Sequence, residues 1–123
     1  MIRHIRYEGR ELPADFNIMT LMQLAKRYDT DLSGLREVFA SFTDEMSSIT
    51  FIANVGAIAL TEGARRTAHG AEHERYDVDR LYDMLTVDMS ISEQLLTELF
   101  SSMEGSKVFP TAVKSRPPKK KTK

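Results

Sequence analysis

Residues 49–60 read Ile-Thr-Phe-Ile-Ala-Asn-Val-Gly-Ala-Ile-Ala-Leu, the most apolar stretch of this 123-residue chain. Its apolar side chains would cover most of the circumference of a helix, and such a helix must be surrounded by other elements. The stretch is far shorter than the roughly 20 residues that an α-helix needs to cross a bilayer. It therefore predicts a buried central helix in a soluble protein.

The pattern of this central helix extends on both sides of the stretch. Thr43 or Asp44 can cap its start, and Gly70 ends the pattern. Small residues would let a neighbouring helix approach closely, and Gly56, which costs about 1 kcal/mol against Ala in a helix, makes close packing a sensible compensation. One side of the helix is predicted to consist of Met46, Ile49, Ala53, Gly56, Ala57, Leu60 and Ala64, and another of Phe51, Val55 and Ile58.

The first sixteen residues predict a small β-hairpin. The segment 2–7 alternates imperfectly, as a short strand does, and Glu8-Gly9-Arg10-Glu11 supplies a turn. Residues 12–16 can return as a second strand. Pro13 has no backbone N–H, so this strand is expected at the edge of a sheet.

Two helices are predicted between the hairpin and the central helix. Asn17 can cap the first helix, and Asp31 precedes the second. The inward face of the first is predicted to be Ile18, Leu21, Met22, Ala25 and Tyr28. The inward face of the second is predicted to be Leu32, Leu35, Phe39 and Phe42.

Two more helices are predicted after the central one. Asp77 can cap the fourth helix of the chain, and Ser90-Ile91-Ser92-Glu93 fits a capping box at the start of the fifth, which Gly105 ends. The fourth helix would carry Val78, Leu81, Tyr82 and Leu85. The fifth would turn Ile91, Leu95, Leu99 and Met103 inward.

Charge divides the chain into two parts. Residues 1–106 hold all eighteen acids and ten basic residues, a net charge of −8. The remaining segment is basic, rich in proline and without periodicity, which is typical of disorder. Its basic residues are Lys107, Lys114, Arg116, Lys119, Lys120, Lys121 and Lys123. We therefore expect a mainly α-helical domain over 1–105, with about five helices packed round the central one and an N-terminal hairpin, and a disordered basic tail over 106–123.

The motifs point away from catalysis. The chain has no cysteine, and neither a P-loop nor a dinucleotide-binding glycine pattern occurs. His69-Gly70-Ala71-Glu72-His73 spells the zinc-binding string H-x-x-E-H, but it lies where glycine and polar neighbours end a helix. An exposed loop is therefore favoured over a zinc site. The sequence predicts a binding protein that is not an enzyme, with no cofactor and no metal.

Two methionines are candidate partner-binding residues. Met19 and Met89 fall off the main apolar stripes of their helices. Flexible thioethers suit a surface that accommodates a partner helix. Most of the methionines are predicted to fill the core.

The order of these elements resembles the tail assembly chaperones of long-tailed bacteriophages. The resemblance covers about residues 1–105: the hairpin, the Leu/Met-rich first helix, the helix around Gly56-Ala57-Ile58-Ala59-Leu60, and the two capped helices after it. It rests on layout and contains no residue-level motif. It implies a non-enzymatic protein of the infected cell's cytoplasm that coats the tape measure protein and recruits tail tube subunits. It also implies a longer form made by ribosomal frameshifting near the end of the shorter reading frame.

The sequence leaves a second function open. A nucleic-acid-associated accessory protein could use the basic tail to contact phosphates, with salt-dependent and sequence-blind affinity. Phe109 is the only aromatic residue in that tail, so base-specific recognition is not indicated. Homo-oligomerisation is also left open, whereas no membrane partner is expected.

Overall fold

The computed structural model describes residues 2–69 and 71–105. Its elements are β1 (Ile2–Tyr7), β2 (Arg10–Asp15), α1 (Ile18–Arg27), the 3-10 turn η1 (Leu32–Gly34), α2 (Leu35–Ala40), α3 (Glu45–Thr67), α4 (Val78–Val87) and α5 (Ser90–Gly105). The predicted fold class, mainly helical with an N-terminal hairpin, is confirmed. The predicted basic tail lies outside the described residues.

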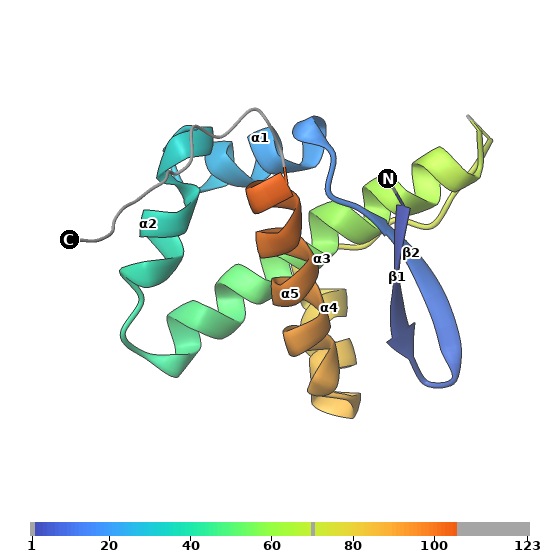
Figure 1. Ribbon diagram of the computed structural model, residues 1–123. Helices are drawn as coiled ribbons and strands as arrows, with labels where there is room; N and C mark the ends of the chain where they lie inside the picture. The colour runs from blue at the N-terminus through green and yellow to red at the C-terminus, as the bar shows by residue number, and fades with distance from the viewer. Residues whose placement is uncertain (1, 70, 106–123) are drawn as a thin grey trace.

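Helix α3 is the centre of the fold. Figure 1 shows it running through the middle of the molecule, and it contacts β2, α1, α4 and α5. The Asp44 carboxylate accepts a hydrogen bond from the Ser47 amide at 2.8 Å, so Asp44 is the N-cap. The helix ends at Thr67, and Gly70 lies outside the described residues. A buried central helix, as predicted from its apolar circumference, is therefore confirmed.

The sequence pattern assigned Met46 to an apolar side of α3, and this assignment is wrong. Met46 is 76% exposed. None of the residues 45–50 is fully buried, so the first turn of α3 projects beyond the elements packed around it. The periodicity of apolar residues shows which side of α3 faces the core. It cannot show how far along α3 the neighbouring elements extend.

The hairpin is confirmed, with a shorter turn than predicted. Only Glu8 and Gly9 form the turn, and both have positive φ, 51° and 75°. Two-residue turns of this kind match the twist of the flanking strands. Arg10 and Glu11 therefore belong to β2, where they pair with Tyr7 and Arg6.

Both strands of the hairpin contact a helix, β1 contacting α5 and β2 contacting α3. Gln94 of α5 bonds the backbone of Arg6 twice, accepting from its N–H at 2.8 Å and donating to its carbonyl at 3.0 Å. On the other side β2 packs directly on α3 at Gly63, where an added Cβ would lie 2.6 Å from the Ala14 Cα. These contacts join both strands of the hairpin to the helical part of the fold.

Aromatic rings join α2 and the end of α1 to α3. Phe51 is completely buried, and its ring lies 5.1–5.8 Å from three others. Those neighbours are Tyr28, Phe39 and Phe42. Leu35 is buried as predicted, whereas Leu32, Phe39 and Phe42 are partly buried against the core.

Helices α4 and α5 cover another side of α3. Asp77 caps α4 by accepting from the Arg80 amide at 2.8 Å, as predicted. The four residues predicted to face inward on α5 are at most 2% exposed: Ile91, Leu95, Leu99 and Met103.

The predicted capping box on α5 is wrong. Ser90 is already helical, and both its backbone N–H and its hydroxyl donate to the Asp88 carboxylate, at 3.0 and 2.7 Å. Because the Ser90 hydroxyl is oriented toward Asp88, the Asp88 carboxylate stabilises the start of the helix in place of the predicted box. A charged acceptor forms a stronger hydrogen bond than a neutral one.

A leucine at position 56 is expected to destabilise the fold by roughly 1–3 kcal/mol through overpacking. An added Cβ at Gly56 would lie 3.0 Å from Leu81 Cγ and from Leu95 Cδ1, on α4 and α5. Urea unfolding of Gly56→Leu followed by circular dichroism measures the loss. Unchanged stability would show that α4 and α5 do not lie against this part of α3.

Candidate protein-binding surface on α1

The outer face of α1 carries a group of exposed apolar side chains. Ile18, Met19 and Met22 are 50, 53 and 52% exposed. Positions 18 and 22, and positions 19 and 22, are neighbours on a helix surface, so the three side chains are contiguous. We call these three residues the α1 stripe.

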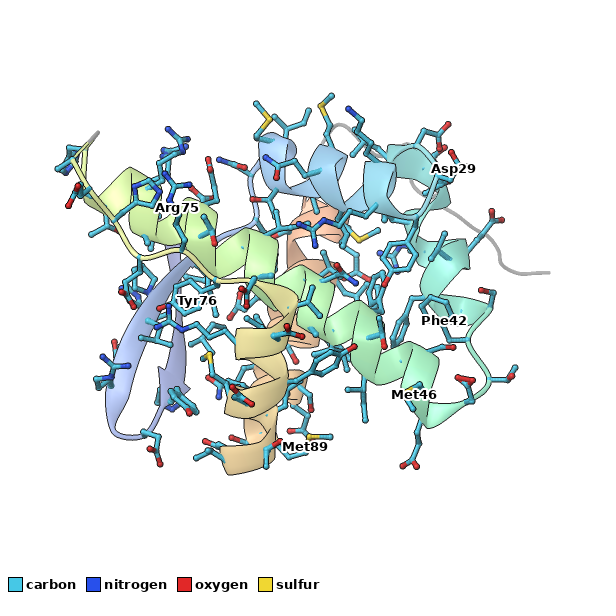
Figure 2. The ribbon with its side chains drawn as sticks, turned by 180° about the vertical axis from the view of Figure 1, so that it is seen from behind. Asp29, Phe42, Met46, Arg75, Tyr76 and Met89 are labelled. Carbon is cyan, nitrogen blue, oxygen red and sulfur yellow. The ribbon has the colours of Figure 1, made fainter. Side chains whose placement is uncertain are left out.

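A hollow adjoins the stripe at the C-terminal end of α1. It has a volume of about 740 Å³ and shares Met22 with the stripe. Asp29, just after the end of α1, is one of its lining residues, and Figure 2 shows this end of the helix at the margin of the molecule. We call it the α1 hollow; its lining is Met22, Ala25, Lys26, Asp29, Thr30, Asp31 and Leu32.

The stripe is exposed because α1 turns a different face toward the core from the one that the sequence pattern predicts. Thr20, Leu21, Leu24 and Ala25 are the buried residues of the helix. Ile18 and Met22, which the sequence pattern assigned to the inward face, lie outside. Leu21 and Ala25 are buried as predicted, so the predicted face is wrong by part of a turn.

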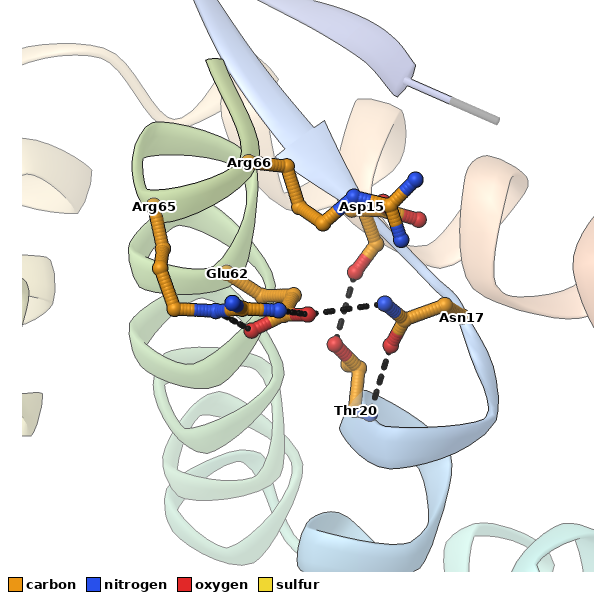
Figure 3. A network of polar contacts seen from close by, with 6 residues as sticks. All are labelled: Asp15, Asn17, Thr20, Glu62, Arg65 and Arg66. Carbon is orange, nitrogen blue, oxygen red and sulfur yellow. Dashed lines mark hydrogen bonds and ion pairs between the residues drawn. The ribbon is translucent and has the colours of Figure 1, made fainter. Parts of the chain in front are cut away.

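Polar contacts hold the start of α1 in this orientation (Figure 3). The Thr20 hydroxyl donates to the Asp15 carbonyl at 2.7 Å and is buried there. Asn17 caps α1 through its side-chain oxygen, which accepts from the Thr20 amide, and its Nδ2 donates to Glu62 Oε2 at 2.8 Å. These bonds tie the start of α1 to β2 and to α3.

Two arginines of α3 complete the network. Arg65 donates to both carboxylate oxygens of Glu62, at 2.9 and 2.6 Å. Arg66 forms an ion pair with the buried Asp15 at 3.5 Å. The Arg65 guanidinium lowers the pKa of Glu62 most, and the Asn17 amide lowers it further, although burial opposes both. The carboxylate of Glu62 is thus stabilised in its charged form.

Glu62→Gln is expected to lower the free energy of unfolding by about 1 kcal/mol at pH 7, because it removes a charge-assisted bond to a half-exposed Arg65. The native pKa of Glu62 lies below its ordinary value. Its stabilising contribution is therefore complete above the ordinary glutamate pKa of about 4.3 and is lost as the pH falls through the native pKa.

Unfolding by urea at pH 7, 5, 4 and 3 tests this expectation. The difference between the wild type and Glu62→Gln should shrink as the pH falls below about 4.3. Glu72→Gln, in an exposed loop, is the matched control. A difference that stays constant across this range would contradict the assigned role of Glu62.

The two predicted partner-binding methionines do not share one surface. Met19 belongs to the α1 stripe, whereas Met89 lies in the connection between α4 and α5, beside the exposed Val87. Figure 2 places Met89 at the opposite end of the view from α1. Prediction of the binding surface missed Ile18 and Met22. No sequence signal marks these two residues as exposed, because the inward position of Thr20 is seen only in the structure.

The described residues of the histidine string, 69 and 71–73, lie in a loop, as predicted. His69 has a positive φ of 53° just after α3, and residues 71–77 are neither helix nor strand. Among residues 2–69 and 71–105, no three side chains of the metal-binding types gather into a site.

The chain matches no protein-family model, no curated protein and no solved structure. Within the described ranges, no helix has both the length and the apolar character needed to cross a membrane. The chemistry of the α1 surface is therefore the basis for a functional proposal.

Proposed function

We propose that this protein is a tail assembly chaperone of a long-tailed bacteriophage. It acts without catalysis in the cytoplasm of the infected cell. It binds helical segments of the tape measure protein and recruits tail tube subunits to them. The observation that supports this proposal is the α1 stripe, three adjacent apolar side chains that are each half-exposed on one helix.

The stripe has the size and chemistry to receive one face of a helix. Amphipathic helices bind through apolar side chains spaced three or four residues apart. Ile18 and Met19 lie four and three residues before Met22. Methionine side chains adapt to partners of different shape. A chaperone that meets many different segments of one long protein needs this tolerance.

The small area of the stripe also suits the proposed role. A single contact of this size is weak, but many copies bound along one long partner gain avidity without tight individual binding. Before assembly, the apolar helix faces of such a partner would otherwise be exposed to aggregation. Covering them segment by segment needs no enzymatic site.

The alternative, binding of nucleic acid by the basic tail, has less support in the described part of the chain. Five of its ten basic residues form ion pairs with acids: Arg3, Arg36, Arg65, Arg66 and Arg80. The net charge of this part is −8, which repels phosphate. The alternative therefore depends on residues 107–123 alone.

Met19→Gln/Met22→Gln is expected to weaken retention of the partner at least tenfold, since burying an amide without a hydrogen-bond partner in an apolar contact costs about 1 kcal/mol or more. The partner for the assay is the product of the long helical reading frame expected directly downstream of the gene, co-expressed and captured with the chaperone. Both side chains are half-exposed, so the melting temperature should change little.

Met89→Gln is the matched control, because Met89 is 52% exposed but lies away from α1. Equal retention by the double variant and the wild type would contradict the α1 surface. Loss of duplex DNA binding on deletion of residues 107–123, with no protein partner captured at all, would favour the nucleic-acid alternative.

A further inference from the structure

We infer that the helix bound on α1 carries a lysine or arginine beyond its apolar face, and that this basic side chain lies in the α1 hollow between Asp29 and Asp31. The inference rests on the proposed function and specifies the chemistry of the partner segment. It assigns a function to the hollow as well as to the stripe.

The stripe and the hollow form one continuous surface. Met22 belongs to both, and Ala25 and Leu32 extend the apolar lining beyond it. From Ile18 to Arg27, α1 is ten residues long, about 15 Å at 1.5 Å per residue. A partner helix of about three turns is therefore long enough to cover the stripe and reach the hollow.

Two acidic residues, Asp29 and Asp31, lie in the part of the hollow beyond the end of α1. Asp31 Oδ1 accepts hydrogen bonds from the Gly34 amide at 3.1 Å and the Ser33 hydroxyl at 2.9 Å, which holds the orientation of this carboxylate. Asp29 is held in the left-handed region, with φ 56° and its N–H bonded to the Lys26 carbonyl at 3.1 Å. Both aspartates belong to the lining of the hollow, together with the apolar Met22, Ala25 and Leu32.

The electrostatic balance of the hollow is negative. Lys26 supplies one positive charge against the two carboxylates. The C-terminal end of α1 adds the equivalent of about half a negative charge. A lysine or arginine fits such a site, because its aliphatic stem packs on apolar surface while its charged end meets the carboxylates.

The net charge of the described residues, 2–69 and 71–105, favours the same kind of partner. A net charge of −8 attracts a basic segment and repels an acidic one during encounter. A second copy of this acidic body is a poor occupant for the same reason. The three stripe side chains also supply much less than the roughly 800 Å² per partner of a standard stable interface.

Three synthetic helical peptides test the inference on the full chain. They share one apolar face and differ only in the residue one turn beyond it, which is lysine, glutamine or glutamate. Fluorescence anisotropy at low and at physiological salt measures binding. The lysine peptide is expected to bind at least fivefold more tightly than the glutamine peptide, and the glutamate peptide most weakly, with differences that shrink as salt rises.

Three variants locate the effect. Asp29→Asn/Asp31→Asn keeps the capping oxygen of residue 31 but removes both charges, and it should abolish the preference for lysine. Asp79→Asn/Asp83→Asn changes two exposed acids of α4 by the same charge and should keep the preference. Lys26→Gln should strengthen binding of the lysine peptide.

The outcomes separate the two proposals. Equal affinity for all three peptides, with binding lost in Met19→Gln/Met22→Gln, would overturn the role of the hollow and leave the chaperone proposal standing. Binding of no peptide, with partner capture unaffected by the methionine changes, would overturn both. Self-association in sedimentation that the methionine changes abolish would show that a second copy occupies the surface, and would overturn the inference.

Discussion

Gly63→Ala is expected to lower the free energy of unfolding by about 3 kcal/mol, at the upper end of the usual cost of overpacking. The added Cβ would meet the backbone of β2, at the Pro13 carbonyl and 2.6 Å from the Ala14 Cα. Backbone atoms of a paired strand cannot turn aside as a side chain can. The gain of about 1 kcal/mol in helix propensity offsets only part of this cost.

Gly56→Ala is the matched control for this prediction. Its Cβ would also be too close to other atoms, but those atoms are the ends of the Leu81 and Leu95 side chains, which can move. Its loss of stability should be less than half as large. Urea unfolding followed by circular dichroism compares the two variants, and an equal or smaller loss in Gly63→Ala would mean that β2 does not lie on α3 as described.

Phe51→Ala is expected to lower the free energy of unfolding by about 3–5 kcal/mol, the usual range for a buried phenylalanine. The ring is completely buried, and it contacts three other rings, with centroids at 5.3, 5.1 and 5.8 Å. Its removal leaves a cavity and also loses these favourable ring contacts. Because one of the rings is Tyr28 at the end of α1, the variant should also bind helical peptides more weakly.

Phe42→Ala is the matched control for the aromatic cluster. Phe42 contacts the rings of Tyr28, Phe39 and Phe51 but is only partly buried. Its truncation should therefore cost less than that of Phe51, as measured by the same unfolding experiment. A loss below about 1.5 kcal/mol for Phe51→Ala, or a larger loss for Phe42→Ala, would contradict the placement of Phe51 at the centre of the cluster.

Interactions within one or two turns of a helix were predicted well from the sequence. Asn17, Asp44 and Asp77 each cap the helix that follows them, because the side chain reaches a backbone amide only three residues away. The inward face of α5 was also predicted correctly. Its apolar residues recur every four positions, and no polar residue competes for that face.

The candidate binding surface was only partly predictable. Met19 was identified because it lies off the apolar stripe of its helix, but Ile18 and Met22 were assigned to the core. Met89 is exposed, as a partner-binding residue must be, yet it lies away from α1. Nothing in the spacing of these residues shows which of them share a surface.

The sequence by itself determined the helical class, the N-terminal hairpin, the central position of α3 and three of the helix caps. These features depend on apolar content and on contacts between residues close together in the chain. Tertiary structure alone decided the rotation of α1, and with it the exposed stripe and the hollow. The Asn17–Glu62 bond joins residues 45 positions apart, and the Thr20 hydroxyl is buried on β2. A buried polar group must find a hydrogen-bond partner, so these two bonds turned a threonine inward and two apolar side chains outward, against the periodicity of the helix.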